Sequence, residues 1–358
     1  MLSKLLSGDL PRSRALGALL LLIFLGLASA PFFTSGERAL GAAATICVYI
    51  VLVASYDLLL GYTGIVSFAH TMFYGIGAYG IGLGLASVDE PTWGVMMTGL
   101  GLALLLALAL ALVIGLFALR VRAIFYAMIT LAVASSFAVL ASQLSDFTGG
   151  EDGKTFSVPE VLTPGHTFMD TEVFGRAVDG KLLTYYVVFF GCLVLFLFLL
   201  RLVNSPFGRV LQAIRENEFR AEALGYRTVV YRVWANVVAA LVAVLAGALM
   251  ALWVRYVGPD NTLGFKVMTD ILLIVVIGGM GTMYGAVIGA TLFILAQNYL
   301  MGLMEKASTS LEGVPLLAAA LHPDRWMLWL GVLFILSIYF FPIGIVGKLR
   351  LRSILARR

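Results

Sequence analysis

Polar side chains that could contact a solute are concentrated in one glycine-flanked segment, residues 61–70. Gly61 and Gly64 bracket a Tyr-Thr pair, and Ser67 and His70 follow at helical spacing. Glycine weakens a helix by about 1 kcal/mol relative to alanine, and a broken helix exposes backbone amides that can meet a polar solute. The same residues equally suit close packing of two helices, with His70 bonded to a neighbour. The residues alone leave both interpretations open.

A second glycine-rich segment, residues 278–285, follows the apolar run 271–277. Three glycines among the four residues 278–281 make an uninterrupted helix improbable. The segment lacks the Gly-Lys-Ser/Thr ending of a phosphate-binding loop. We therefore expect a broken helix or a tight turn here, at the inner end of a membrane span.

A third segment, residues 205–231, carries charges of both signs. Pro206 suits the first turn of a helix, and Gly225 is placed to end one. Residues 210–223 then read as an amphipathic helix, with Leu211 and Ile214 beside Ala221 or Phe219 on one side. Such a surface helix could dock on a soluble partner, or it could be an ordinary solvated connector.

The remaining reactive side chains form no catalytic or metal-binding pattern. Histidines and cysteines are far apart in sequence, so neither a ligand set nor a disulfide framework is expected. These residues are His70, His166, His322, Cys47 and Cys192. Asp57 is a lone acid close to the end of an apolar run, where it is either a buried functional acid or solvated at a span end.

The elements that must position these residues are membrane-spanning helices. The chain is 61% hydrophobic and 12% charged, whereas soluble proteins carry about 25% charged residues. Its apolar runs are continuous and do not alternate as barrel strands do, so we expect an all-α polytopic transmembrane helical bundle with glycine-broken segments. About ten spans are expected, near residues 15–31, 39–60, 64–86, 92–119, 123–145, 183–203, 232–256, 268–284, 287–304 and 326–345. The first run ends in Ala-Ser-Ala like a signal peptide, but Pro31 follows it, so we expect an uncleaved span.

Loop charges predict one orientation for this single domain, residues 1–358. Loop 146–182 holds seven acidic against three basic residues and is expected outside, whereas the basic loop 204–231 and the basic tail 348–358 are expected inside. Both termini would then be cytoplasmic. Basic residues lie between and after the apolar runs, so the net charge of +4 indicates membrane orientation and no nucleic-acid partner.

In this order, the motifs resemble permease subunits of bacterial ABC importers of the branched-chain amino acid type, a family that includes urea and short-amide transporters. The likeness covers roughly residues 40–347. It rests on Gly61-Tyr62-Thr63-Gly64, Ser67-Phe68, Ala127-Met128-Ile129-Thr130, Thr148-Gly149-Gly150, Ser205-Pro206-Phe207-Gly208-Arg209, Gly278-Gly279-Met280-Gly281-Thr282 and Phe341-Pro342-Ile343-Gly344. Ala69, where the family usually has glycine, and the run Lys154-Thr155-Phe156 depart from the pattern and weaken any inference about the solute.

The resemblance implies an inner-membrane permease with membrane lipid around it and several protein partners. These are a second homologous permease, two cytoplasmic ATP-binding subunits and a periplasmic solute-binding protein. ATP and Mg²⁺ would be held by the ATP-binding subunits, with no cofactor and no catalytic residue on this chain. In such families an inner helix with a Glu-Ala-x-x-x-Gly pattern inserts into the ATPase, and Glu222-Ala223 with Gly225 is a shortened version of it.

Two sets of residues are therefore expected to act in transport. The expected solute path is lined by Thr63, Gly64, Ser67, His70, Gly278, Gly279 and Gly281. The expected ATPase-coupling residues are Arg215, Glu216, Glu218, Arg220, Glu222 and Gly225. Branched-chain amino acids are the default solute, with urea, amides and small carboxylates as alternatives. An ion-coupled secondary transporter is less favoured, because we identify only Asp57 and His70 as intramembrane coupling groups.

Overall fold

Long apolar helices make up most of the chain in the computed structural model, which describes residues 14–33, 36–118, 123–173, 176–310, 322–341 and 344–347. The basic tail 348–358 lies outside the described residues. Each expected span coincides with a helix. These helices are α2 (Arg14–Phe33), α3 (Glu37–Thr63), α4 (His70–Ala86), α5 (Trp93–Ala118), α6 (Ala123–Gln143), α8 (Gly180–Val203), α11 (Thr228–Val254), α13 (Phe265–Gly278), α14 (Met283–Ser310) and α16 (Trp326–Phe340). The first of them, α2, continues through Pro31 without a break.

Eight segments of the described chain are long and apolar enough to cross a membrane. They are α2, α3, α5, α6, α8, α11, α14 and the stretch Pro259–Gly278, which joins the short helix α12 (Pro259–Thr262) to α13. The other two expected spans are shorter, because α4 has 17 residues and α16 has 15. The expectation of an all-α polytopic bundle with glycine-broken segments is confirmed.

The α3 helix lies at the centre of the bundle and packs against α11, α14 and α8. Beside it, α4 is wedged between α11 and α5. Small residues allow this close approach: a Cβ added at Gly77 would collide with the carbonyl of Val244, and one at Gly247 with the carbonyl of Tyr74. Gly77 of α4 and Gly247 of α11 thus serve close helix packing.

The expected span 64–86 differs from the structure at its beginning, because residues 64–69, the connecting segment, are not helical and α4 begins only at His70. The His70 ring contacts Leu52 and Ser55 of α3, which lie about two to three turns before the end of that helix. The connecting segment therefore runs back along α3, and α4 starts within the bundle rather than at its edge.

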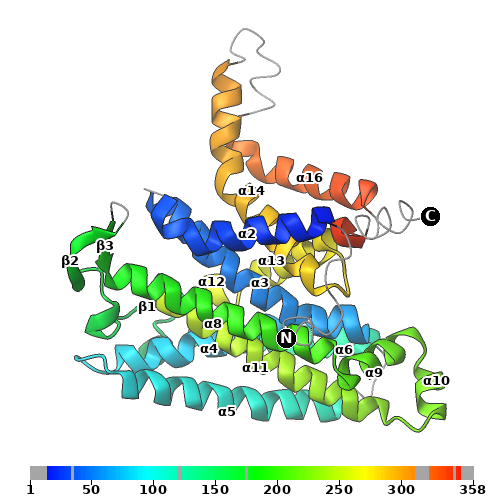
Figure 1. The fold of residues 1–358 in the computed structure, drawn as a ribbon. Coiled ribbons are helices and arrows are strands. Elements are labelled where there is room, and N and C mark those ends of the chain that lie inside the picture. Colours follow the sequence, from blue (N-terminus) through cyan, green and yellow to red (C-terminus); the bar gives the residue numbers. More distant parts are fainter. Residues whose placement is uncertain are drawn as a thin grey trace.

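The two loops named in the sequence lie at opposite ends of the bundle (Figure 1). One end carries α7 (Ser145–Thr148), the short helix Glu160–Leu162, and two small sheets in which β1 (Lys154–Thr155) pairs with β4 (Tyr256–Val257) and β2 (Thr167–Val173) with β3 (Arg176–Asp179). The other end carries α9 (Pro206–Glu216) and α10 (Glu218–Ala223). Which end faces the cytoplasm stays a prediction from the charges.

A further feature is the pair α14 and α16, which projects from the body of the bundle (Figure 1). A short helix, Pro323–Arg325, leads into α16 and packs against α14. Near the body, α14 packs on α3 and α13, and α16 packs on α13.

Candidate functional site

The two glycine breaks meet at the end of the bundle that carries α9. In the first break, Gly64 has a φ of 74° and donates its N–H to the carbonyl of Leu59, which ends α3. In the second, α13 ends at Gly278, and Gly279 and Gly281 have φ values of 112° and 77°. Left-handed backbone of this kind favours glycine. The expected break within residues 278–285 is therefore found where the glycines lie.

Asp57 joins the two breaks. Its side chain is buried, with 2% of the residue exposed, so it is not solvated at a span end. The carboxylate accepts the N–H of Gly281 at 2.9 Å through Oδ1 and at 3.1 Å through Oδ2. A Cβ at Gly61 would collide with both Asp57 Oδ1 and the Gly281 nitrogen. Glycine at position 61 is thus what allows the carboxylate to reach the second break.

Arg215 of α9 reaches into the same place. Its Nη1 donates to the carbonyl oxygen of Gly61, and the guanidinium interacts electrostatically with Asp57. A Cβ at Gly281 would lie 2.8 Å from Arg215 Nη1. A buried carboxylate is stable only when it is hydrogen-bonded and balanced by opposite charge. We call the four residues Asp57, Gly61, Arg215 and Gly281 the joint, because they hold α3, α9 and the turn between α13 and α14 together.

Thr63, Ser67 and His70 are all buried in this structure. Thr63 Oγ1 donates to the carbonyl of Leu59 at 2.6 Å. His70 Nε2 lies 2.9 Å from Ser55 Oγ and 3.2 Å from the carbonyl oxygen of Leu52. These polar groups thus have partners within the bundle, which suits a packing role. A role in lining the solute path stays a prediction for them.

The connecting segment 64–69 is fixed to other helices. Inward-facing residues at 65, 67 and 69 alternate with more exposed ones at 64, 66 and 68. The N–H of Phe68 donates to Thr130 Oγ1 of α6 at 3.1 Å, and the Phe68 ring stacks on Phe265, the first residue of α13, with centroids 6.3 Å apart. The segment therefore leads into α4 and contacts both α6 and the beginning of α13.

The prediction of one amphipathic helix over residues 210–223 is wrong in one respect, because Asn217 divides this region into α9 and α10. Asn217 has extended backbone, and its Oδ1 accepts the N–H of Arg220 at 2.9 Å, so it caps a new helix. The buried positions are Leu211, Ile214 and Ala221. Gly225, with a φ of 91°, follows the end of α10 as expected.

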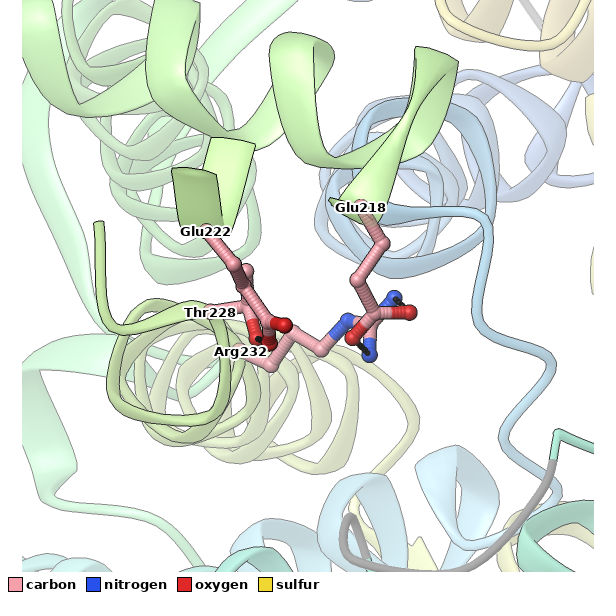
Figure 2. Close-up of polar contacts among 4 residues, drawn as sticks. All are labelled: Glu218, Glu222, Thr228 and Arg232. Atoms are coloured by element: carbon pink, nitrogen blue, oxygen red, sulfur yellow. Dashed lines mark hydrogen bonds and ion pairs between the residues drawn. The ribbon is translucent and has the colours of Figure 1, made fainter. Parts of the chain in front are cut away.

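The acidic residues of α10 bind within the chain (Figure 2). Arg232 of α11 donates to both carboxylate oxygens of Glu218, at 2.5 and 3.0 Å. Thr228 Oγ1 donates to Glu222 at 2.8 Å. All the expected coupling residues except the half-buried Glu218 are exposed, and Arg215 also belongs to the joint. Contact of any of them with an ATPase stays a prediction.

Sequence reasoning missed two apolar side chains on the same surface. Phe219 of α10 is 85% exposed, and Leu224, the residue that follows α10, is 72% exposed. A signal for Phe219 was present, because the amphipathic pattern left open whether Ala221 or Phe219 was buried. Large exposed apolar side chains in a polar loop are typical of docking surfaces.

The chain is similar to permease proteins of branched-chain amino acid transport systems. The family model described as "Branched-chain amino acid transport system / permease component" matches residues 38–338. The proteins named "High-affinity branched-chain amino acid transport system permease protein LivM" from Escherichia coli (strain K12) and Salmonella typhimurium are each 28% identical, over 86% of this chain and 74% of theirs. A "Probable branched-chain amino acid transport permease protein LivM" of Methanocaldococcus jannaschii is 26% identical, over 61% of this chain and 58% of its own. No solved structure matches the chain significantly.

Proposed function

The chain belongs to the family of permease components of branched-chain amino acid transport systems, and on that basis we propose that it forms half of the membrane pore of an ATP-driven importer for these amino acids. The observation that carries this proposal is the joint, in which Arg215 of the surface helix α9 contacts the Gly61 carbonyl and faces Asp57. An importer driven from the cytoplasm needs such a connection between its docking surface and the helices that move.

The docking surface for the two ATP-binding subunits is formed by α9 and α10. Phe219 and Leu224 would enter an apolar groove of the subunit, with Glu216 and Arg220 at the polar rim. The bonds of Glu218 to Arg232 and of Glu222 to Thr228 hold α10 against α11, so a force on α10 would be passed to the bundle. ATP and Mg²⁺ would be bound by the partner subunits, and this chain would contribute no catalytic residue.

Transport follows an alternating-access cycle. ATP binding draws the two ATP-binding subunits together and shifts α9, and Arg215 passes this shift to the ends of α3 and α13. Each state must make different contacts at the joint, since a ligand shifts an equilibrium only through its differential affinity for the two states. A second, homologous permease completes the pore, and a periplasmic binding protein delivers the solute to the opposite end, near loop 146–182.

The multi-pass bundle belongs in the bacterial inner membrane, with both termini and α9–α10 cytoplasmic. This orientation is supported by the basic residues of loop 204–231 and by the acidic excess of loop 146–182. Accessibility of single introduced cysteines in intact cells tests it: position 219 should react only after the membrane is opened, and position 151 without opening.

Reconstitution of the whole importer tests the function. The chain, a second permease, two ATP-binding subunits and the binding protein are assembled in proteoliposomes, and uptake of leucine, urea, acetamide and isobutyrate is compared. We expect leucine uptake that requires ATP, and ATP hydrolysis that rises when leucine-loaded binding protein is added. Leucine uptake by this chain alone, without the ATP-binding subunits, would contradict the proposal.

The docking assignment has its own test in the same vesicles. The double charge reversal Glu216→Lys with Arg220→Glu should abolish stimulated ATP hydrolysis but leave membrane insertion intact. The matched control is Glu305→Lys with Lys306→Glu, an exposed acid-base pair on the projecting part of α14. Equal hydrolysis in both double variants would remove α9–α10 from the docking surface.

A further inference from the structure

A cavity of 480 Å³ is lined by α13, α14 and α16, and its lining includes no residue of the joint or of α9–α10. Most of its wall is apolar and includes Leu273, Ile277, Leu292, Phe293, Leu330 and Phe334. Four polar side chains complete it: Lys266 and Asp270 from α13, Gln297 from α14 and Ser337 from α16. Volume and composition are those of a small-molecule site, in which a few polar groups orient a ligand within apolar walls.

Among the described residues, the polar side chains of this cavity make no ion pair or hydrogen bond, although Asp270 interacts electrostatically with Lys266. Lys266 and Asp270 are about one helical turn apart, yet every ion pair found among the described residues joins other side chains. The side chains of Lys266, Asp270 and Gln297 also make no hydrogen bond with any residue that the structure describes. Ionisable side chains within a span are costly unless they face water or a partner, and they mark solute paths. An acid and a base held open in one cavity are therefore available to a ligand.

The position of the cavity suits a solute in transit. Asp270 interacts electrostatically with Tyr49, which lies near the midpoint of α3. The helix that carries Asp270, α13, is separated from α12 by Leu263 and Gly264, so the candidate span Pro259–Gly278 is a broken helix. The first residue of α13, Phe265, stacks on Phe68 of the connecting segment, and its last residue precedes the turn that Asp57 binds. Solute sites of transporters lie near the bilayer midplane beside broken helices of this kind.

We propose that this cavity binds the transported amino acid as a zwitterion, with Lys266 at the carboxylate, Asp270 at the ammonium group and the apolar wall around the aliphatic side chain. The proposal rests on the proposed function and narrows its solute. Urea and amides carry no charge for either residue, and a simple carboxylate leaves Asp270 without a partner. A site with paired charges rejects ligands that leave one of them unsatisfied.

A cysteine in the cavity wall allows a direct test in the assembled importer. Ser337 of α16 lines the cavity, and Ser337→Cys changes its size little. The native Cys47 and Cys192 are buried, so labelling by a small thiol reagent reports on position 337. In phosphatidylglycerol vesicles without binding protein, leucine should slow this labelling. In Lys266→Gln or Asp270→Asn, the leucine concentration that gives half protection should rise at least about tenfold.

Two probes that each lack one charge of leucine separate the roles of the two residues. We expect 4-methylpentanoate, which has no ammonium group, to protect weakly in wild type and better in Asp270→Asn, where no unpartnered carboxylate faces it. Isopentylamine, which has no carboxylate, should protect weakly in wild type and better in Lys266→Gln, where no unpartnered ammonium group faces it. The charge-retaining variants Lys266→Arg and Asp270→Glu should keep part of the protection by leucine, which a general folding defect would not allow.

Matched controls outside the cavity are Asp260→Asn on α12 and Lys306→Gln on α14, both exposed, and neither should change protection. The headgroup of phosphatidylethanolamine is also a zwitterion, so vesicles containing it are compared with phosphatidylglycerol alone. Protection by that lipid and not by leucine would overturn the proposal. So would an importer that takes up leucine but shows no protection, or no labelling at position 337. Absence of ATP-driven leucine uptake would instead refute the proposed function.

Discussion

The carboxylate of Asp57 binds the backbone N–H of Gly281 with both oxygens, at 2.9 and 3.1 Å, although 224 positions separate the two residues in sequence. This contact joins the end of α3 to the turn between α13 and α14. Arg215 interacts electrostatically with the same carboxylate and bonds to the carbonyl of Gly61. A surface helix, a central helix and a glycine turn therefore meet at one buried charge.

Removing the Asp57 carboxylate should destabilise the bundle. Asp57→Ala leaves the half-buried N–H of Gly281 without this acceptor, which costs about 1–3 kcal/mol of unfolding free energy. Asp57→Asn keeps an acceptor oxygen but not the charge that interacts with Arg215. It should therefore lose less unfolding free energy than Asp57→Ala. Thermal unfolding of the purified chain measures both. Asp260→Ala, at an exposed position of α12, is the control, and an equally large loss there would contradict a special role for Asp57.

Arg215 should be needed for coupling rather than for docking. Arg215→Ala breaks the contact with Gly61, so the ATP-binding subunits should still copurify with the permease while stimulated ATP hydrolysis and leucine uptake fall together. Arg209→Ala, at an exposed position of the same helix, should change neither activity. If Arg215→Ala lost the ATP-binding subunits on purification, the residue would belong to the docking surface instead.

Gly61 should tolerate no side chain. Gly61→Ala places a methyl group against Asp57 and the nitrogen of Gly281, and so forces the joint apart. We expect loss of uptake and a lower unfolding temperature. Gly101→Ala in α5, where a Cβ meets nothing within 4 Å, should stabilise its helix by up to about 1 kcal/mol. Full leucine uptake by Gly61→Ala would show that transport does not require the contacts of the joint.

The apolar side chains of α10 should carry the docking energy. Phe219→Ala and Leu224→Ala remove exposed side chains, so the unfolding temperature of the isolated permease should not change. Each should weaken binding of the ATP-binding subunits about tenfold, because truncating an interface anchor usually lowers the binding free energy by about 1–2 kcal/mol. Gln212→Ala, exposed on α9, is the control in titrations with purified subunits, and equal affinities would refute the assignment.

The ion pair between Glu218 and Arg232 should hold α10 in place. The two side chains are 40% and 17% exposed, so solvent screening limits the pair to about 1 kcal/mol. Arg232→Ala should therefore release α10 more often and increase tryptic cleavage after Arg220 several-fold. In the exchanged double variant Glu218→Arg with Arg232→Glu, cleavage should return toward the wild-type rate. A double-mutant cycle without coupling would contradict the pair.

The helices and both breaks could be predicted from the sequence, because long apolar runs and clustered glycines act locally. The loop 205–231 was also predicted, but Asn217 was not recognised as a cap that divides its helix. The joint could not be predicted, because it depends on how residues 57, 61, 215 and 281 come together in three dimensions. Asp57 was noticed only as an isolated acid, and nothing in the sequence near it indicates Gly281 as its partner.

Asp270 could have been found. It lies within the expected span 268–284, yet only Asp57 and His70 were considered as groups for coupling. A count of ionisable residues in each expected span would have identified it, with Lys266 just before the span. The cavity that unites them with Gln297 depends on the packing of α13, α14 and α16, which the sequence pattern does not specify.

The close fit at the joint also limits which substitutions its four positions can accept during evolution. A methyl group at position 61 would strike Asp57 and Gly281, and a shorter side chain at position 215 would leave the Gly61 carbonyl and the buried charge without their partner. Substitution at one of the four positions is then harmful unless another changes with it. Across a lineage of such permeases, positions 57, 61, 215 and 281 should be retained or replaced together, although they are far apart along the gene.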